Sequence, residues 1–454
     1  MANDNISNEL KIYELSLIWK EAEYNFAFWE KLNGTVNWDD EYKKALIRVL
    51  ATTNLYDYYM ELMKFISLLR DGHTGVWFPQ SIGNSAEYTA KLPISTRLIG
   101  GERIITNVKK CIVDKVRRWS VIKKIDGVDI DEYIEKNIYP YIWHEKKDSA
   151  DFTVNNFLSC GAAGSIVEFE VEHDGKTETI ALTRTKGDVD WVYDNSTMKP
   201  GENLRQEYKS ESHSIAFTDD NIAIITINTF DNDKLTEEFY ANQNMLKNMR
   251  GFIIDVRNNG GGMGEYARNI AKAFISGEFA GESDATPVHI AMYRAQAKWC
   301  NFGDKTYNEI VAERGENEHL EKVYKIYNHI YYQKSDDTVN RDGCPFLLNQ
   351  PLVVLSSCNT ASAAEDFLIY LDYAKRATIV GSASYGSTGQ PLFIDLESGG
   401  GFRICTRNCT YPDGRQFIDI GVQPHIKCEI TLDDYKNGVD SVMNKGLEEM
   451  RKLI

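Results

Sequence analysis

Ser362 is the residue whose position in the sequence most clearly suggests chemistry. It lies in residues 351–367, PLVVLSSCNTASAAEDF, where the apolar run 351–355 predicts a buried strand and the residues that follow predict a helix. Backbone N–H groups in the first turn of a helix lack intrahelical partners, and the helix dipole is positive there. A serine at such a corner could have an oxyanion stabilised by the backbone, as acyl transfer requires. From this stretch alone, an ordinary serine helix cap is the commoner explanation.

Two glycine-rich loops follow other predicted strands. The loop DVRNNGGG at 255–262 follows the apolar run 251–254, and GSASYGSTG at 381–389 follows the strand predicted at 377–380. Glycine allows a backbone N–H to approach a reacting oxygen, because no Cβ stands in the way. We therefore expect Gly261 and Ala363 to supply the two N–H donors of an oxyanion hole. The dinucleotide pattern GxGxxG and the phosphate pattern GxxxxGK[ST] fit neither loop.

His73 is the first candidate for a general base. It lies in the turn DGHTG at 71–75, between a long amphipathic helical pattern and a predicted short strand at 76–78. A histidine in a glycine-flanked turn is placed to react rather than to pack in a core, although polar residues in loops commonly have no role in chemistry.

The bulk composition narrows the class of protein. The chain has 454 residues, of which 43% are hydrophobic, so it is globular in type and long enough for two or three domains. Its formal net charge is −16 and its lysines and arginines form no cluster, so we expect no nucleic-acid partner. No apolar run approaches the roughly 20 residues of a membrane helix, and the first residues do not have the pattern of a signal peptide. We therefore expect no membrane partner.

The cysteines and histidines indicate neither a disulfide framework nor a metal site. The eight cysteines are scattered and include no CxxC pair, which favours free thiols in a reducing compartment and thus a cytoplasmic protein. Because the histidines and cysteines lack the spacing of zinc ligands, we expect no metal, and we expect no organic cofactor.

The chain divides into regions of different periodicity. Residues 1–90 are helical and carry the DGHT turn, 91–186 are dominated by short β runs, and 187–212 are polar and predict a linker. Residues 213–454 alternate strands and helices, which predicts an α/β core with parallel strands and a terminal helix over about 432–453. An aromatic-rich segment at about 284–348 interrupts this alternation and predicts an insertion.

Four segments together resemble the tail-specific (C-terminal processing) serine peptidase family, including its tricorn-core and interphotoreceptor retinoid-binding branches. They occur in the family's order at 255–262, 360–365, 376–389 and 421–424, the last reading GVQP. The resemblance implies a ClpP/crotonase-like α/β core. The phrases SVIKKIDGVDIDEYI and GSIVEFEVEHDGKTETIALTR resemble a PDZ-like domain, a module that takes a peptide as an added strand.

One departure from the family pattern bears on the mechanism. The C-terminal processing branch carries its general-base lysine in a Phe-Gly-Lys-Gly phrase, where this chain has Tyr385-Gly386-Ser387-Thr388-Gly389. A serine hydroxyl is not a base at neutral pH, so a Ser–Lys dyad is excluded. The tricorn-like branch uses a histidine in a phrase that resembles DGHT, which makes His73 the expected base.

The resemblance also suggests the remaining site residues. A carboxylate just before GVQP would orient His73, which favours Asp419, with Asp413 and Glu365 as alternatives. His425 replaces the acid usual after that phrase and is the reserve candidate for the base. The other histidines lie in contexts that suit a base less well: His144, His173, His213, His289, His319 and His329.

The sequence therefore predicts a serine peptidase that hydrolyses polypeptide C-termini or unfolded peptides through an acyl-enzyme. Its expected partner is a peptide or protein substrate. The alternative is a catalytically inactive module that binds peptides or hydrophobic ligands on the same fold, since a fold does not determine a function. The presence of both Ser362 and His73 favours the enzyme.

Overall fold

The protein folds into two compact units in a computed structural model. The smaller unit comprises Met1–Gln80, Ser283–Asp336 and Gly389–Cys409, and the larger comprises Ser81–Glu282, Asp337–Thr388 and Thr410–Ile454. The structure describes residues 6–143, 146–187, 190–193, 198–288, 293, 296–297 and 300–454.

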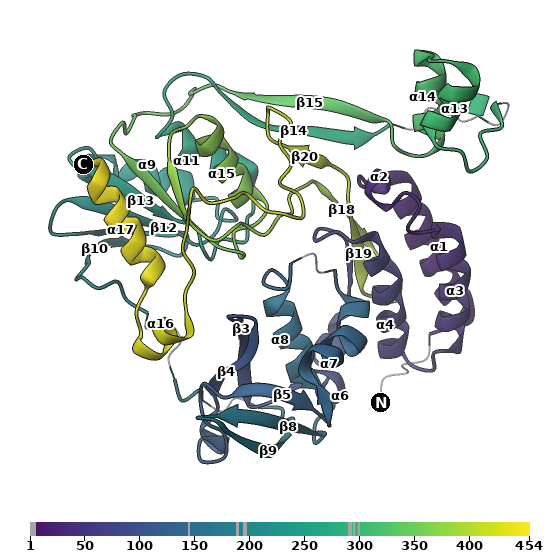
Figure 1. The fold of residues 1–454 in the computed structure, drawn as a ribbon, viewed down its shortest axis with the longest axis horizontal. Coiled ribbons are helices and arrows are strands. Elements are labelled where there is room, and N and C mark those ends of the chain that lie inside the picture. Colours follow the sequence, from purple (N-terminus) through teal and green to yellow (C-terminus); the bar gives the residue numbers. More distant parts are fainter. Residues whose placement is uncertain are drawn as a thin grey trace. The chain divides into compact units, whose positions relative to one another are not determined.

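A seven-stranded sheet forms the centre of the larger unit (Figure 1). Its strands, in spatial order, are β10 (Arg205–Lys209), β11 (His213–Phe217), β12 (Ile222–Ile227), β13 (Gly251–Asp255), β16 (Leu352–Ser356), β17 (Thr378–Gly381) and β21 (Ile426–Lys427). The first two pairings are antiparallel, and the strands from β12 to β21 are parallel. The predicted α/β core with parallel strands is therefore confirmed. β10 lies inside the predicted linker 187–212, so that segment contributes an edge strand. Its residues are mostly exposed and polar, and for this reason the sequence pattern did not indicate a strand.

Helices flank this sheet. They are α9 (Leu235–Ala241), α10 (Gln243–Leu246), α11 (Gly264–Lys272), α15 (Ala363–Tyr373), α16 (Leu432–Asn437) and α17 (Ser441–Leu453). Apolar residues of α17, including Leu447 and Met450, pack on the sheet face that carries Ile253 and Val353. The prediction of one terminal helix over 432–453 was wrong, because Gly438 adopts a left-handed φ of +66° and ends α16 before α17 begins.

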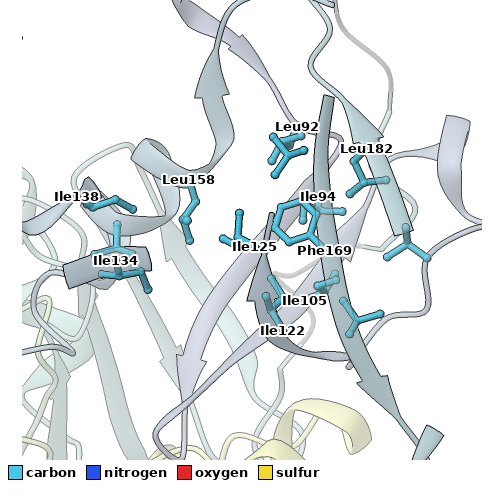
Figure 2. Packing of buried hydrophobic residues seen from close by; sticks show 14 of the residues in the cluster. Leu92, Ile94, Ile105, Ile122, Ile125, Ile134, Ile138, Leu158, Phe169 and Leu182 are labelled. Atoms are coloured by element: carbon cyan, nitrogen blue, oxygen red, sulfur yellow. The ribbon is translucent and has the colours of Figure 1, made fainter. Parts of the chain in front are cut away.

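A second, antiparallel sheet occupies the region predicted as PDZ-like. Its strands run in the order β3-β4-β5-β8-β9, with β6 beside β5: β3 (Ile94–Ile99), β4 (Glu102–Val108), β5 (Val121–Ile125), β6 (Val128–Asp129), β8 (Ile166–His173) and β9 (Lys176–Thr183). The helices α7 (Ile130–Asn137) and α8 (Asp151–Ser159) share its core, in which Phe169 is surrounded by aliphatic side chains such as Ile105, Ile125 and Leu182 (Figure 2). Smaller elements complete the region: α5 (Gln80–Gly83), α6 (Ala86–Thr89), β2 (Ala90–Lys91), η2 (Lys110–Ile112), η3 (Tyr139–Tyr141) and β7 (Cys160–Gly161).

The smaller unit begins with a helical segment. Its N-terminal elements are α1 (Asn8–Asn25), α2 (Trp29–Leu32), α3 (Trp38–Ala51), α4 (Leu55–Ile66), η1 (Ser67–Leu69) and β1 (Gly75–Trp77). β1 pairs with β19 (Gly401–Cys405), which also pairs with β18 (Pro391–Asp395). The predicted insertion holds α13 (Tyr307–Arg314) and α14 (Glu318–Tyr327), whose aromatic residues pack in a small core of their own.

One further sheet contains β14 (Phe279–Pro287), β15 (Tyr332–Val339) and β20 (Asn408–Thr410), with β14 in the middle. None of the helices that the structure describes is long and apolar enough to cross a bilayer. Over the same described residues, no three His, Cys, Asp or Glu side chains are placed to hold a metal ion.

A buried carboxylate organises the smaller unit around the strand that follows the DGHT turn. Glu14 of α1 has no exposed surface, and it accepts hydrogen bonds from the Tyr58 hydroxyl (2.9 Å), the Ser398 N–H (2.7 Å) and the Ser398 hydroxyl (2.8 Å). The Tyr59 hydroxyl accepts from the Gly400 N–H at 2.8 Å in the same turn. Because this turn joins β18 to β19 and β19 pairs with β1, these contacts help to fix the strand that begins two residues after His73.

Glu14→Ala is expected to lower the free energy of unfolding by roughly 3 kcal/mol, because it leaves the buried Tyr58 hydroxyl and the partly buried Ser398 N–H without their acceptor. Urea denaturation of the full chain followed by circular dichroism measures the change. Glu9→Ala, which removes an exposed carboxylate from the same helix, is the control and should lower the free energy of unfolding far less. Equal effects of the two substitutions would show that the buried network contributes little.

Candidate active site

Ser362 occupies the strand-to-helix corner that the sequence predicts. β16 ends at Ser356 and α15 begins at Ala363, so Ser362 is the N-cap of α15, with φ +56° and ψ −127°. Positive φ is uncommon outside glycine and costs about 1–3 kcal/mol where the surroundings enforce it. An ordinary N-cap is extended, as Asn37 and Asn54 are in this chain. A serine on a strained strand-to-helix turn is instead typical of a nucleophile presented by an α/β fold.

The glycine-rich loop after β13 lies directly against this corner. A Cβ built on Gly261 would stand 2.6 Å from the Ser362 Cβ and 3.0 Å from the Ala363 nitrogen, and Gly261 itself has φ +99°. Only glycine fits this position, because a side chain would collide with the serine and strain the backbone. The structure therefore brings three predicted site residues together: Ser362, Ala363 and Gly261.

The two expected oxyanion donors differ in their hydrogen bonding. Within the described part of the chain, the Ala363 N–H has no acceptor. The Gly261 N–H donates to the Asn259 side-chain oxygen at 2.9 Å, so it would have to exchange that acceptor to bind an oxyanion. Asn259 is fully buried, and its carbonyl accepts from the Ala361 N–H at 3.1 Å. Sequence reasoning missed this residue, although an asparagine just before three glycines was a signal.

Charged and hydroxyl side chains fix the glycine loop to the serine loop. Arg257 donates to both oxygens of Asp255 and of Asp440, the N-cap of α17, at 2.7–2.9 Å. The Ser357 hydroxyl donates to the Arg257 carbonyl at 2.6 Å, and the Thr360 hydroxyl donates to the Val256 carbonyl at 3.0 Å. These contacts fix the loop that follows β13 relative to the loop that follows β16.

Glu365, an alternative third member, lies in the interior of the larger unit. It is fully buried in the first turn of α15, where its carboxylate accepts from the backbone of Ser362 and from the loop Ser384-Tyr385-Gly386-Ser387. Burial raises the pKa of Glu365 to about 7, although its hydrogen bonds act in the opposite direction. All of these donors belong to the larger unit. The carboxylate therefore joins the backbone of Ser362 to the loop at 384–387.

Lys146 is a charged residue beside the loop at 384–387, and sequence reasoning did not select it. Its ammonium donates to the Ser384 carbonyl and, at 3.4 Å, to the Ile420 carbonyl. Burial lowers its pKa, while the charge of Glu365 opposes that change. Lys146 therefore ties the loop at 384–387 to the segment around residue 420.

Asp419 contacts the loop at 384–387 directly. Its N–H donates to the Gly386 carbonyl at 2.7 Å, and its backbone has φ +69°. Asp413, the other alternative, is exposed and ion-paired with Arg415 at 2.9 Å, and Arg415 also reaches Asp372 near the end of α15. Of these two aspartates, Asp419 alone has a backbone contact to the loop that follows β17.

His425, the reserve base, lies at the C-terminal end of α15, whereas Ser362 lies at its N-terminal end. Its Nδ1 accepts from the Ile379 N–H at 2.9 Å, and its Nε2 lies 3.1 Å from Asp372. Asp372 is ten residues after Ser362 on the same helix, which corresponds to about 15 Å at the rise of an α-helix. His425 therefore fits a structural role at the helix C-terminus, and it does not reach the serine.

His73 belongs to the smaller unit, in a turn held by Asp71. The Asp71 carboxylate accepts from the His73 N–H at 3.1 Å and from the Thr74 hydroxyl at 2.6 Å. Burial, and then the positive charge of Arg403, lower the pKa of His73 to about 4. Its imidazole is therefore neutral, and able to accept a proton, over the whole physiological range.

The remaining histidines have other surroundings. His213 is fully buried on β11 beside Ser212 and Glu238, and burial lowers its pKa. His173 contacts the Ser120 hydroxyl, His319 packs against Tyr293, and His329 lies 3.8 Å from Glu23. His144 and His289 lie outside the described residues.

Comparisons with known proteins concern the region that contains Ser362. Residues 221–428 match the model of peptidase family S41. The chain is 26% identical over 205 residues to the carboxy-terminal-processing protease of Bartonella bacilliformis, in an alignment that covers 45% of this chain and 36% of that protein. The match thus spans about a third of the relative. The resemblance to the tail-specific peptidases expected from the motifs is confirmed.

Solved structures support the fold. Mature CPAF superposes with a TM-score of 0.73 at 16% identity, covering 98% of this chain and 99% of that one. A putative peptidase from Parabacteroides merdae gives a TM-score of 0.54 at 15% identity, covering 98% and 97%. At these identities the likeness concerns the architecture, which includes the α/β core predicted from the sequence.

If Ser362 is a nucleophile, Gly261→Ala is expected to slow its reaction by roughly a hundredfold or more, because the new Cβ collides with the serine and displaces the N–H expected to bind an oxyanion. The rate of covalent labelling by a fluorophosphonate measures this effect. Gly260→Ala is the matched control: no atom lies within 4 Å of a Cβ at Gly260, and its φ is not positive, so its labelling should remain close to that of the wild type. Equal labelling rates of the two variants would show that Gly261 has no role in the reaction of Ser362.

Proposed function

We propose that this chain is a serine peptidase that hydrolyses peptide bonds of polypeptide C-termini or unfolded peptides. The observation that carries the proposal is the strained N-cap conformation of Ser362 beside Gly261, with the Ala363 N–H left without an acceptor in the described part of the chain. A helix N-terminus stabilises negative charge, so an oxyanion formed there would be favoured. The match to peptidase family S41 and the relationship to a carboxy-terminal-processing protease support the same reaction and substrate class.

In this proposal His73 is the general base. Its neutral imidazole takes the proton from the Ser362 hydroxyl as Oγ attacks the scissile carbonyl carbon. Negative charge develops on the carbonyl oxygen, which the N–H groups of Ala363 and Gly261 bind, the latter after leaving Asn259. Collapse of the tetrahedral intermediate breaks the C–N bond, and His73 protonates the departing amine.

Deacylation follows the same steps with water as the nucleophile. His73 removes a proton from water, the hydroxide attacks the ester carbonyl, and Ser362 leaves with the proton from His73. Asp419 is the proposed carboxylate that orients His73 and stabilises the imidazolium. Its backbone bond to Gly386, in the loop that also contacts Ser362, supports this assignment over Asp413.

One observation favours the alternative of a non-catalytic binding module. The Gly261 N–H already donates to the Asn259 side chain, so the second oxyanion donor is occupied in this structure. Reaction with a mechanism-based probe separates the two functions, because only an activated serine forms the covalent bond.

Treatment of the full chain with a fluorophosphonate is expected to label one residue, Ser362, as read by mass spectrometry of the digested protein. Ser362→Ala should abolish labelling, and His73→Ala should reduce it by about a thousandfold or more, as removal of a catalytic base does. His425→Ala is the control and should label at the wild-type rate. A wild type that does not react, even after addition of an unfolded protein such as reduced casein, would favour the binding module.

A further inference from the structure

We propose that Glu365 is a positioning residue of this site, whose buried carboxylate holds the backbone of Ser362 and the loop Ser384–Ser387 in a single arrangement. The inference rests on the proposed function and adds to it a residue that does not touch the substrate.

The carboxylate has four donors from two segments that are distant in sequence. Oε1 accepts from the Ser384 hydroxyl (2.5 Å) and the Gly386 N–H (2.7 Å), and Oε2 accepts from the Ser387 N–H (2.9 Å) and the Ser362 N–H (3.2 Å). An ionised carboxylate has lone pairs for all four and donates nothing. The side chain is fully buried, so no solvent competes for these bonds.

These bonds act on the conformation of the nucleophile. The Ser362 N–H also donates to the Ser387 carbonyl at 3.1 Å, so Glu365 and the loop bind the same backbone group. The positive φ of Ser362 is unfavourable by itself and persists only if surrounding contacts enforce it. Without the carboxylate, the corner would be free to relax towards an ordinary extended N-cap.

The same carboxylate connects the nucleophile to the segment that carries Asp419. Ser384, which donates to Glu365, accepts from the Val422 N–H at 2.6 Å, and its own N–H donates to the Val422 carbonyl at 3.1 Å. Gly386, the second donor to Oε1, accepts from the Asp419 N–H at 2.7 Å. A change at Glu365 would therefore displace Ser362 and the proposed acid relative to each other.

The protonation state of Glu365 sets how well it can act in this way. Burial raises its pKa to about 7, and the nearby charged or titratable groups are Lys146, whose ammonium faces the loop, Asp366, which accepts from Thr388, and the Cys358 thiol. The thiol has a pKa of about 11 and is neutral. A protonated carboxyl oxygen must donate, and of the four partners only the Ser384 hydroxyl can accept. The bond to the Gly386 N–H is then weakened.

A pH profile consequently distinguishes Glu365 from the base. His73, with a pKa of about 4, stays neutral from pH 5 upward, so it does not contribute an acid limb near neutrality. Glu365 loses its charge as the pH falls through about 7, and the reactivity of Ser362 should fall with it.

The test is the rate constant for fluorophosphonate labelling of the full chain between pH 5 and 9. We expect the wild-type rate to fall as the pH drops through about 7. Glu365→Gln places an amide N–H₂ against the backbone donors, so it should label about tenfold or more slowly at pH 8 and show no limb between pH 6 and 8. Asp372→Asn removes a carboxylate from the other end of the same helix and should keep the wild-type rate and profile.

The outcomes separate this inference from the proposed function. A wild type that does not label refutes the function, whereas a reactive wild type with Glu365→Gln equal to it in rate and profile refutes the role of Glu365. If circular dichroism shows that Glu365→Gln does not fold, Ser384→Ala provides the second test. This substitution removes one donor to the ionised carboxylate, which should raise the pKa of Glu365 and move the fall in labelling rate to higher pH. A fall at the wild-type pH would overturn the inference.

Discussion

The site depends on a serine backbone held in a conformation that serine does not favour by itself. Ser362 adopts φ +56° because three kinds of contact converge on it: a glycine with no Cβ on one side, a buried carboxylate in the first turn of its own helix, and the carbonyl of Ser387 from a third loop. The conformation places the serine before the N-terminus of α15. There the Ala363 N–H, which has no acceptor among the described residues, and the helix dipole favour negative charge.

The parallel sheet explains why these loops meet. β13, β16 and β17 are adjacent and parallel, so the glycine loop, the serine corner and the Ser384–Ser387 loop all leave the sheet at the same edge. Open α/β sheets generally bind ligands at the carboxyl ends of their strands for this reason. Arg257 then joins the end of β13 to α17, which fixes the glycine loop from the other side of the sheet.

The sequence predicted the elements whose signal is local. The strand-to-helix corner at Ser362, the glycine loop and the antiparallel β region all follow from periodicity and turn residues. Tertiary contacts determined the rest. The Asn259 side chain accepts from the Gly261 N–H, the buried Glu365 carboxylate binds the loop Ser384–Ser387, and His425 pairs with Asp372 far along α15. Spacing alone could reveal none of these contacts. The break at Gly438 was local but was missed, because the apolar pattern continues across it.

We propose Ser362 as a nucleophile that His73 activates, and these two residues belong to different compact units. The most direct measurement is a crystal structure of the full chain after reaction with a fluorophosphonate. We expect phosphorus bonded to the Ser362 Oγ, a phosphoryl oxygen within hydrogen-bond distance of the Ala363 N–H, and an imidazole nitrogen of His73 beside the adduct. An adduct on another residue, or one on Ser362 with His73 far from it, would show that His73 does not activate Ser362.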